Sequence, residues 1–249
     1  MHAPGRFLAF DTSTDRLSVG VAVGQRQWLH EGPGAAQASA SLIPAVLDLL
    51  AQAGLALSEL DAIVFGRGPG SFTGLRTACA VAQGLAAGAG LPVLPVDTLL
   101  AVANEAAHRH TATGHALPTA LSALLDARMN EIYVQDYAQD FERSPTGWQA
   151  LGSCRVLAPE QLLWPDDVPR LLAGNVFEVY GARLPALPAA ARVVHALPTA
   201  AALLRLAPGL MALGLAVPAA LALPLYVRDK VAQTTDERLA AKAAAQTTL

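Results

Sequence analysis

The chain has 249 residues, which is enough for one large domain or two small ones with an ample core. It is 53% hydrophobic, 15% charged and 5% aromatic, and its 17 basic and 20 acidic residues give a net charge of −3. Without a long basic run, this balance argues against a protein that binds RNA through its phosphates on its own.

The two cysteines and the first apolar run bear on the compartment. Cys79 and Cys154 are too few and too far apart to suggest a disulfide framework or a zinc site, and we expect Cys79 to be a small core residue. The apolar run at residues 7–10 meets Asp11 at once, which is unlike a secretory signal. We therefore expect a cytoplasmic protein.

Residues 206–227 form an uncharged run about as long as a bilayer span. Pro208, Pro218 and Pro224 interrupt it, and prolines break the backbone pairing that a membrane helix needs. We expect two buried segments with a loop between them, and no membrane helix.

Apolar periodicity divides the chain into short strands and helices. We expect strands at residues 7–10, 17–23, 28–30, 62–65, 93–96, 121–125, 132–137, 149–157 and 170–173. We expect helices from about residue 41 to Gly54, from Gly74 to about Gly90, and at residues 99–107, 159–164, 200–206 and 235–245. Strands that alternate with helices indicate an α/β fold.

The two halves of the chain open with the same pattern. In the first half, a strand runs into Asp11 and a polar turn leads to a second strand. In the second half, a strand runs into Asp126 and a short polar turn again leads to a strand. This weak internal repeat predicts two related α/β domains.

Residues 66–74 contain four glycines and a proline between a strand and a helix. A helix start presents unpaired N–H groups to a ligand, but the spacing here matches no phosphate loop. A Walker loop needs Lys where Leu75 stands, and a dinucleotide turn needs glycine in place of Thr73. A nucleophile elbow also fails, because Ser71 directly follows a glycine. From spacing alone, the segment is a tight turn that packs a helix on a sheet.

The helix after this turn has two faces. Its core stripe consists of Leu75, Ala78, Cys79, Ala82, Leu85, Ala86 and Ala89. A second stripe of mostly small residues consists of Thr77, Val81, Gly84 and Gly88. Each glycine inside a helix costs about 1 kcal/mol relative to alanine, so the stripe needs a reason. Close packing on a neighbouring helix of the same chain and docking of another protein both supply one.

The segment GRGPGSFTGLR at residues 66–76 resembles the signature of the TsaB family, which is also called YeaZ. Three further segments match the family, at residues 7–14, 126–133 and 224–232. The resemblance is strong in the first half of the chain and weak between about residues 141 and 222.

The resemblance implies an actin-like (ASKHA) fold, which is an α/β fold of two related domains with mixed sheets. It implies an N-terminal domain at residues 1–103, on which residues 222–249 pack back, and a C-terminal domain at residues 104–221.

The resemblance also implies a role. The family is the non-catalytic partner of the TsaD enzyme in threonylcarbamoyladenosine modification of tRNA next to the anticodon. A member of it is a pseudo-enzyme that binds TsaD and the ATPase TsaE, reaches tRNA only through the complex, and pairs with itself when alone. The expected partner-binding residues are Gly66, Arg67, Gly68, Pro69, Gly70, Ser71, Phe72, Thr73, Gly74, Arg76, Thr77, Val81, Gly84 and Gly88.

Actin-like ATPases carry an aspartate at the tip of their first hairpin, where it orients magnesium and water. Asp11, Thr12 and Ser13 occupy that place here, and Asp126 occupies the matching place in the second half. These are also ordinary turn residues, and the motifs supply no full phosphate cradle. We expect no cofactor of the chain itself and leave ATP or ADP at the partner interface open.

Catalytic relatives carry a metal-binding pair of histidines four residues apart, a spacing that puts both on one helix face. His108, His110 and His115 are spaced by two and five, and we expect them in a polar loop between the domains. We expect no metal site.

Two positions depart from the family pattern. Ala38 stands where relatives often carry a histidine, and Asn130 replaces a more usual glycine in a turn that asparagine also tolerates. The alternative from another class is a self-sufficient ATP-dependent kinase or ATPase that uses Asp11 and Asp126. A metal-dependent glycoprotease ranks lowest.

Overall fold

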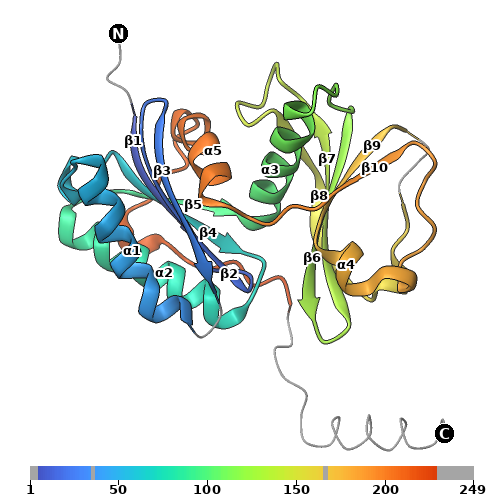
Figure 1. Cartoon of the computed structure of the whole chain (residues 1–249), viewed down its shortest axis with the longest axis horizontal. Helices are drawn as coiled ribbons and strands as arrows, with labels where there is room; N and C mark the ends of the chain where they lie inside the picture. Colours follow the sequence, from blue (N-terminus) through green and yellow to red (C-terminus); the bar gives the residue numbers. More distant parts are fainter. Residues whose placement is uncertain (1–4, 35–36, 165–167, 229–249) are drawn as a thin grey trace, which may run out of the picture.

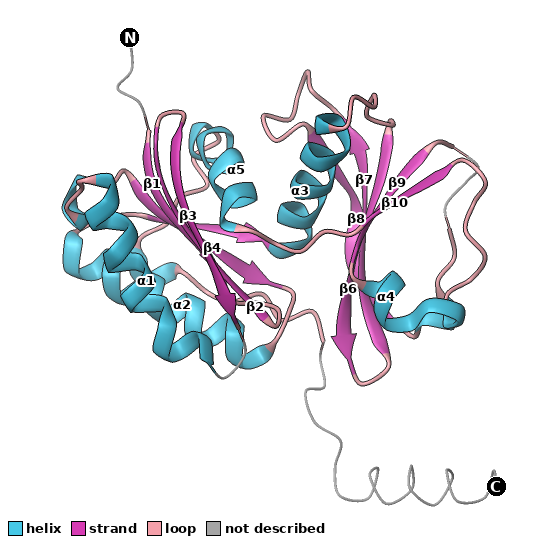
Figure 2. Cartoon of the chain, in the orientation of Figure 1, coloured by secondary structure: helices cyan, strands magenta, loops and turns pink. Residues whose placement is uncertain are grey.

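The computed structural model describes residues 5–34, 37–164 and 168–228, which form two α/β domains side by side (Figure 1). Each domain is built on one five-stranded mixed sheet. Helices flank both sheets, and two of them lie between the domains (Figure 2).

The first sheet has the strand order β3-β2-β1-β4-β5. Its strands are β1 (Arg6–Asp11), β2 (Arg16–Val23), β3 (Arg26–Pro33), β4 (Ala62–Gly68) and β5 (Val93–Asp97). The first three pair antiparallel, whereas β4 and β5 add in parallel beyond β1. The central strands β1 and β4 are apolar and almost wholly buried, as a sheet with helices on both faces requires.

The second sheet repeats this plan with the order β10-β9-β6-β7-β8. Its strands are β6 (Ala120–Arg128), β7 (Glu131–Gln139), β8 (Trp148–Leu157), β9 (Arg170–Gly174) and β10 (Ala191–Val194). Strands β6 to β8 pair antiparallel, and β9 and β10 add in parallel beyond β6. The same order and directions confirm the predicted pair of related α/β domains and the actin-like fold.

Within the described residues, five helices cover the faces of the two sheets. On the first sheet, α1 (Ala38–Ala53) and α2 (Phe72–Ala89) cover one face and α5 (Ala200–Ala212) covers the other. On the second sheet, α3 (Thr98–Ala112) and the short α4 (Val176–Tyr180) lie on opposite faces. Short 3₁₀ turns are η2 (Leu57–Glu59), η3 (Pro159–Gln161), η4 (Gly181–Arg183) and η5 (Ala219–Leu221).

The two helices between the domains are exchanged relative to their order in the chain. Helix α3 follows the first sheet but packs on the second, and α5 follows the second sheet but packs on the first (Figure 1). Leu203 and Leu206 of α5 bury their side chains in the cluster that contains Phe7 and Val64. This packing differs from the expected C-terminal domain at residues 104–221, because the second apolar face of the first sheet is covered mainly by α5, together with Leu100 and Ala101 of α3.

Several element boundaries also differ from expectation. Helix α3 continues to Ala112, so His108 and His110 lie on its last turns and not in a loop; only His115 follows it. The helix expected at residues 159–164 is a single 3₁₀ turn, while α4 and β10 were not predicted. The helix expected at residues 235–245 lies outside the described residues. None of the described helices is long and apolar enough to cross a membrane.

A buried acid joins the two exchanged helices. Glu105 of α3 accepts hydrogen bonds from Arg109 (2.7 Å), from Arg205 of α5 (2.6 Å) and from Thr199 (3.0 Å). Burial alone would raise the pKa of Glu105, but the bonds from Arg109 and Arg205 bring that pKa below its ordinary value. Thr199 is also the N-cap of α5, because its side chain accepts from the backbone N–H of Ala202.

We therefore expect Thr199→Ala to lower the free energy of unfolding by about 1–2 kcal/mol, because it removes both the cap and a donor to Glu105. Gln37→Ala is the matched control, since Gln37 is the N-cap of α1 and makes no side-chain cap bond. Urea unfolding of both variants checks this. Equal effects of the two substitutions would contradict the role of Thr199.

Candidate functional site

The glycine segment after β4 is clasped by the first β-hairpin. The backbone N–H of Ser71 donates to the carbonyl of Ser13 at 2.7 Å, and the hydroxyl of Thr12 donates to the carbonyl of Gly74 at 2.7 Å. Thr12 and Ser13 are both buried. The turn at residues 12–13 and the start of α2 are therefore one packed unit, held largely by backbone groups.

Three glycines are required by this close approach. A Cβ on Gly66 would overlap the carboxylate of Asp11, and a Cβ on Gly74 would overlap the carbonyl of Thr12. On Gly70 it would lie 2.6 Å from the carbonyl oxygen of Ser13. Contacts within the chain therefore require glycine at these three positions, which the spacing alone does not reveal.

The fourth glycine of the segment contacts the end of the described chain. Gly68 has φ +122°, a conformation that favours glycine, and a Cβ there would lie 2.5 Å from the carbonyl oxygen of Leu225. The N–H of Leu225 donates to the carbonyl of Arg67 at 2.7 Å. The guanidinium of Arg67 in turn pairs with Asp97 at 2.5 Å, at the end of β5.

Asp11 is turned into the protein. Its Oδ1 accepts from the N–H (2.8 Å) and hydroxyl (2.7 Å) of Ser13, while Oδ2 points at Gly66 and is buried with no hydrogen-bond partner among the described residues. Burial raises the pKa of Asp11 to about 6, although the bonds from Ser13 oppose the rise. In this position the Asp11 carboxyl group stabilises the hairpin turn through its bonds to Ser13.

A cavity of about 320 Å³ lies between the domains. Both hairpin turns, the start of α2 and residues 225–228 line it: Ser13, Thr14, Asp15, Gly70, Ser71, Phe72, Leu75, Leu125, Asp126, Ala127, Arg128, Met129, Tyr133, Asn175, Val179, Leu225, Tyr226, Val227 and Arg228. Of the residues predicted to hold a nucleotide, Ser13 and Asp126 thus face the cavity. Asp11 and Thr12 are not among its described lining residues.

Asp126 is already engaged by its neighbours. Its Oδ1 accepts from the Tyr180 hydroxyl at 2.7 Å and from the N–H of Arg128 at 2.8 Å, and its Oδ2 pairs with the Arg128 guanidinium at 3.1 Å. Its own N–H donates to the side chain of Asn175 at 3.0 Å. Burial, and then the bond to Asp126, raise the pKa of Tyr180 to about 12. The two predicted hairpin carboxylates thus differ in their surroundings: Asp11 faces the interior, whereas Asp126 lines the cavity and is bonded to Tyr180 and Arg128.

The two glycines of the small-residue stripe of α2 face outward, whereas Thr77 is half-buried and Val81 packs against the first core cluster. Gly84 and Gly88 are exposed, and a Cβ at either position would meet no atom of the described chain within 4 Å. Packing on a neighbouring helix of the same chain therefore does not explain them. On the adjacent α1, Ile43 and Leu47 are 44% and 60% exposed. Neither residue was predicted to belong to a site, although each directly follows a core position of α1.

An aromatic and cationic cluster lies where α2 begins. The guanidinium of Arg76 stacks on the ring of Phe72 at 3.8 Å and donates to the Tyr226 hydroxyl at 3.1 Å. The Tyr226 ring lies 5.2 Å from that of Phe72. Tyr226 was not among the predicted site residues, because the resemblance of residues 224–232 carried no role with it.

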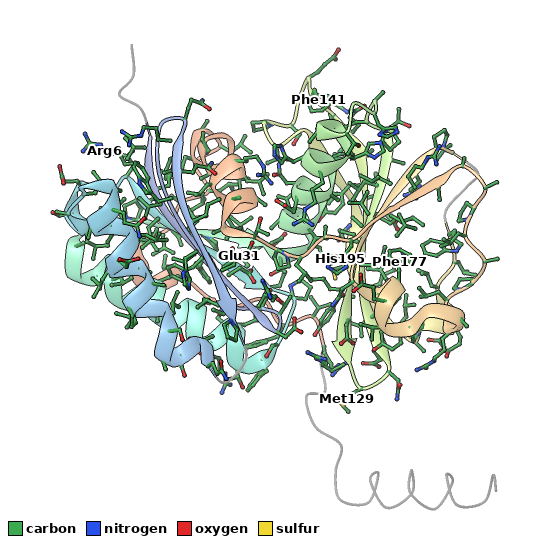
Figure 3. The ribbon with its side chains drawn as sticks, viewed as in Figure 1. Arg6, Glu31, Met129, Phe141, Phe177 and His195 are labelled. Carbon is green, nitrogen blue, oxygen red and sulfur yellow. The ribbon has the colours of Figure 1, made fainter. Side chains whose placement is uncertain are left out.

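The histidines do not assemble a metal site among the described residues, where no group of three or more His, Cys, Asp or Glu side chains could hold an ion. The rings of His110 and His115 stack at 5.1 Å. His195 pairs with Glu178 at 3.0 Å and, with Glu31 across the domain boundary, lines a second hollow of about 260 Å³ (Figure 3).

The glycine contacts predict opposite effects of one substitution at two places in α2. Gly74→Ala would drive a methyl group into the Thr12 carbonyl, so we expect a loss of about 1–3 kcal/mol or more in the free energy of unfolding. Gly84→Ala meets open space inside a helix, so we expect a gain of about 0.5–1 kcal/mol. Denaturant unfolding of both variants measures this, and the same sign for both would refute the assignment.

Asp11 predicts a pH dependence of stability. Its folded pKa of about 6 lies above the model-compound value of 3.8, so the wild type loses stability as pH rises from about 4 to about 6. The difference of about 2 units corresponds to about 3 kcal/mol. We expect the stability of Asp11→Asn relative to the wild type to rise by that order across this window. A stability difference between Asp11→Asn and the wild type that stays constant across this window would contradict the raised pKa of Asp11.

The family described as "TsaD: tRNA N6-adenosine threonylcarbamoyltransferase" matches residues 33–168, more than half of the chain. A protein of Haemophilus influenzae named "tRNA threonylcarbamoyladenosine biosynthesis protein TsaB" is 40% identical over 163 residues, 63% of this chain and 65% of the relative. Its namesake in Escherichia coli is 38% identical over 135 residues, 54% of this chain and 56% of the relative.

The chain thus spans less than two thirds of the length of these two curated relatives. A solved structure covers more of it: YeaZ from Pseudomonas aeruginosa matches with a TM-score of 0.78 and 38% identity, over 90% of this chain and 100% of that one. With the glycine segment, the twin sheets and this match in agreement, the chain belongs to the TsaB (YeaZ) family.

Proposed function

We propose that this chain is a non-catalytic scaffold subunit that binds the TsaD threonylcarbamoyltransferase and supports threonylcarbamoyladenosine modification of tRNA. The relatives from Haemophilus influenzae and Escherichia coli are named for that biosynthesis. The observation that carries the proposal is the outward face of α1 and α2. Here two helix glycines, at which an added Cβ would meet no other part of the described chain, lie on a helix adjacent to the one that exposes Ile43 and Leu47.

The chemistry of that face suits a protein partner. A helix without side chains at Gly84 and Gly88 lets another backbone approach closely, and the exposed Ile43 and Leu47 supply apolar area to bury. The Arg76, Phe72 and Tyr226 cluster adds the residue types that dominate binding energy at interfaces. The same face would pair two copies of the chain when TsaD is absent.

The non-catalytic part of the proposal is supported by the two hairpin acids. Asp11 points at Gly66, and Asp126 is bonded to Tyr180 and Arg128, so neither is arranged to hold a metal-bound phosphate. With a net charge of −3, the chain would reach tRNA through its complex, which we expect also to include TsaE. A bound nucleotide would belong to the assembled interface.

The test is to mix the chain with its TsaD and to measure binding by calorimetry and size-exclusion chromatography. We expect a heterodimer with the wild type and at least about a hundredfold weaker binding with Gly84→Arg, because a long charged side chain would be buried at the interface. Leu163→Arg is the matched control: it places the same charge on a residue of the second domain that is 78% exposed.

Equal affinities of Gly84→Arg and Leu163→Arg would exclude this face. The competing function, a self-sufficient ATPase, is measured in the same samples. Steady ATP hydrolysis by the lone chain that disappears with Asp11→Asn would overturn the non-catalytic assignment, because only a hairpin acid with a catalytic role would behave in this way.

A further inference from the structure

Residues 222–228 cross from the first domain to the second as an extended segment, which we call the strap. At its beginning, Ala222 is buried in the core under α2, and its carbonyl accepts from the Gln83 side chain at 2.9 Å and from the Cys79 thiol at 3.3 Å. Further along, Leu225 bonds to Arg67 and Tyr226 lies against Phe72. The first half of the strap is therefore fixed to the first domain.

The second half of the strap is fixed to the second domain. Val227 packs against the core cluster that contains Tyr133 and Leu125. The Arg228 guanidinium then reaches the turn between β6 and β7, where Nη2 donates to the carbonyls of Ala127 (3.1 Å) and Arg128 (3.4 Å) and pairs with Glu131. Only 17% of the Arg228 side chain is exposed.

The turn that Arg228 contacts has an unusual backbone. Arg128, Met129 and Asn130 have φ of 61°, 53° and 61°, three consecutive left-handed residues, none of them glycine. Each such residue costs free energy that its surroundings must offset. Two guanidinium groups stabilise this turn. Arg228 donates to its carbonyls, and Arg183 donates to the Asn130 side chain at 2.8 Å. Met129 lies at the outer tip of this turn (Figure 3).

The strap is also a wall of the interdomain cavity. Leu225, Tyr226, Val227 and Arg228 all line it, together with Ser13 and Ser71 of the first domain. The strap therefore contacts both domains along one side of the cavity that lies between them.

We propose that residues 222–228 form a clamp that holds the two domains at a fixed separation, with Arg228 as its latch on the left-handed β6–β7 turn. The clamp links the start of α2 to the second domain through Tyr226 and Arg228. This inference goes beyond the proposed function and needs no partner.

Hydrogen–deuterium exchange of the full chain tests the clamp. In Arg228→Ala we expect exchange to rise by at least about tenfold both in peptides that cover residues 127–132 and in those that cover residues 222–228, while β1 and β4 keep their wild-type rates. Arg143→Ala is the matched control, because it removes an exposed ion pair to Asp140 in the same domain. We expect no change in the control at either place.

Faster exchange of both segments in Arg228→Ala supports the clamp. An increase in the turn alone, or no difference from Arg143→Ala, overturns it. If Arg228→Ala does not fold, Arg228→Lys takes its place: lysine keeps the charge near Glu131 but has one terminal nitrogen, whereas Arg228 places Nη2 on the carbonyls and the acid and Nη1 on the Met129 sulfur at the same time. We expect the same two segments to exchange faster in Arg228→Lys than in the wild type. Wild-type exchange rates in that variant would contradict the role of Arg228 as the latch.

Discussion

The contact between the turn at residues 12–13 and the glycine segment at residues 66–74 is the constraint on which the site depends. Two stretches of backbone meet with no side chain between them, and only glycine at Gly66, Gly70 and Gly74 permits this approach. The contact fixes where α2 begins, and therefore where its outward face lies. It also encloses Asp11, so that the hairpin acid supports the turn and does not reach the cavity.

The two domains share one plan but finish their first hairpins differently. In the first domain the turn is covered by the glycine segment and its acid is buried. In the second domain the turn is shorter and left-handed, and its acid lines the cavity, where Tyr180 and Arg128 hold it. The two domains therefore repeat the same fold, but their two hairpin acids have different surroundings. One hairpin serves as a packing element, and the other serves as a point of attachment between domains.

Much of this could be read from the sequence, because strands and long amphipathic helices leave periodic patterns. The hairpin at Asp11, the helix that ends at Gly54 and the repeat at Asp126 are examples. The reasons for individual glycines could not be read, since Gly74 and Gly84 look alike in a sequence and differ only in what a side chain would meet. The end of α3 was missed because Thr111 bonds back to the helix carbonyls instead of breaking it.

Other features depend on contacts between distant segments, which no local pattern encodes. The packing of α5 on the first sheet, the burial of Ala222 under α2 and the reach of Arg228 to Ala127 are of this kind. The short α4 and the four-residue strand β10 lie in the part of the chain with the weakest periodicity. Tertiary contacts decide such elements more than propensity does.

The exchange of α3 and α5 has a consequence for the order of events during synthesis. The first sheet leaves the ribosome early, yet one of its faces is covered mainly by α5, which is made after the whole second sheet. The second sheet likewise depends on α3, which is made before it. The second domain therefore has its covering helix before its sheet is made, whereas the first domain is completed only when α5 arrives. The backbone N–H of Ala200 in α5 then donates to Ser18, 182 positions earlier in the chain, and contacts of such separation form slowly.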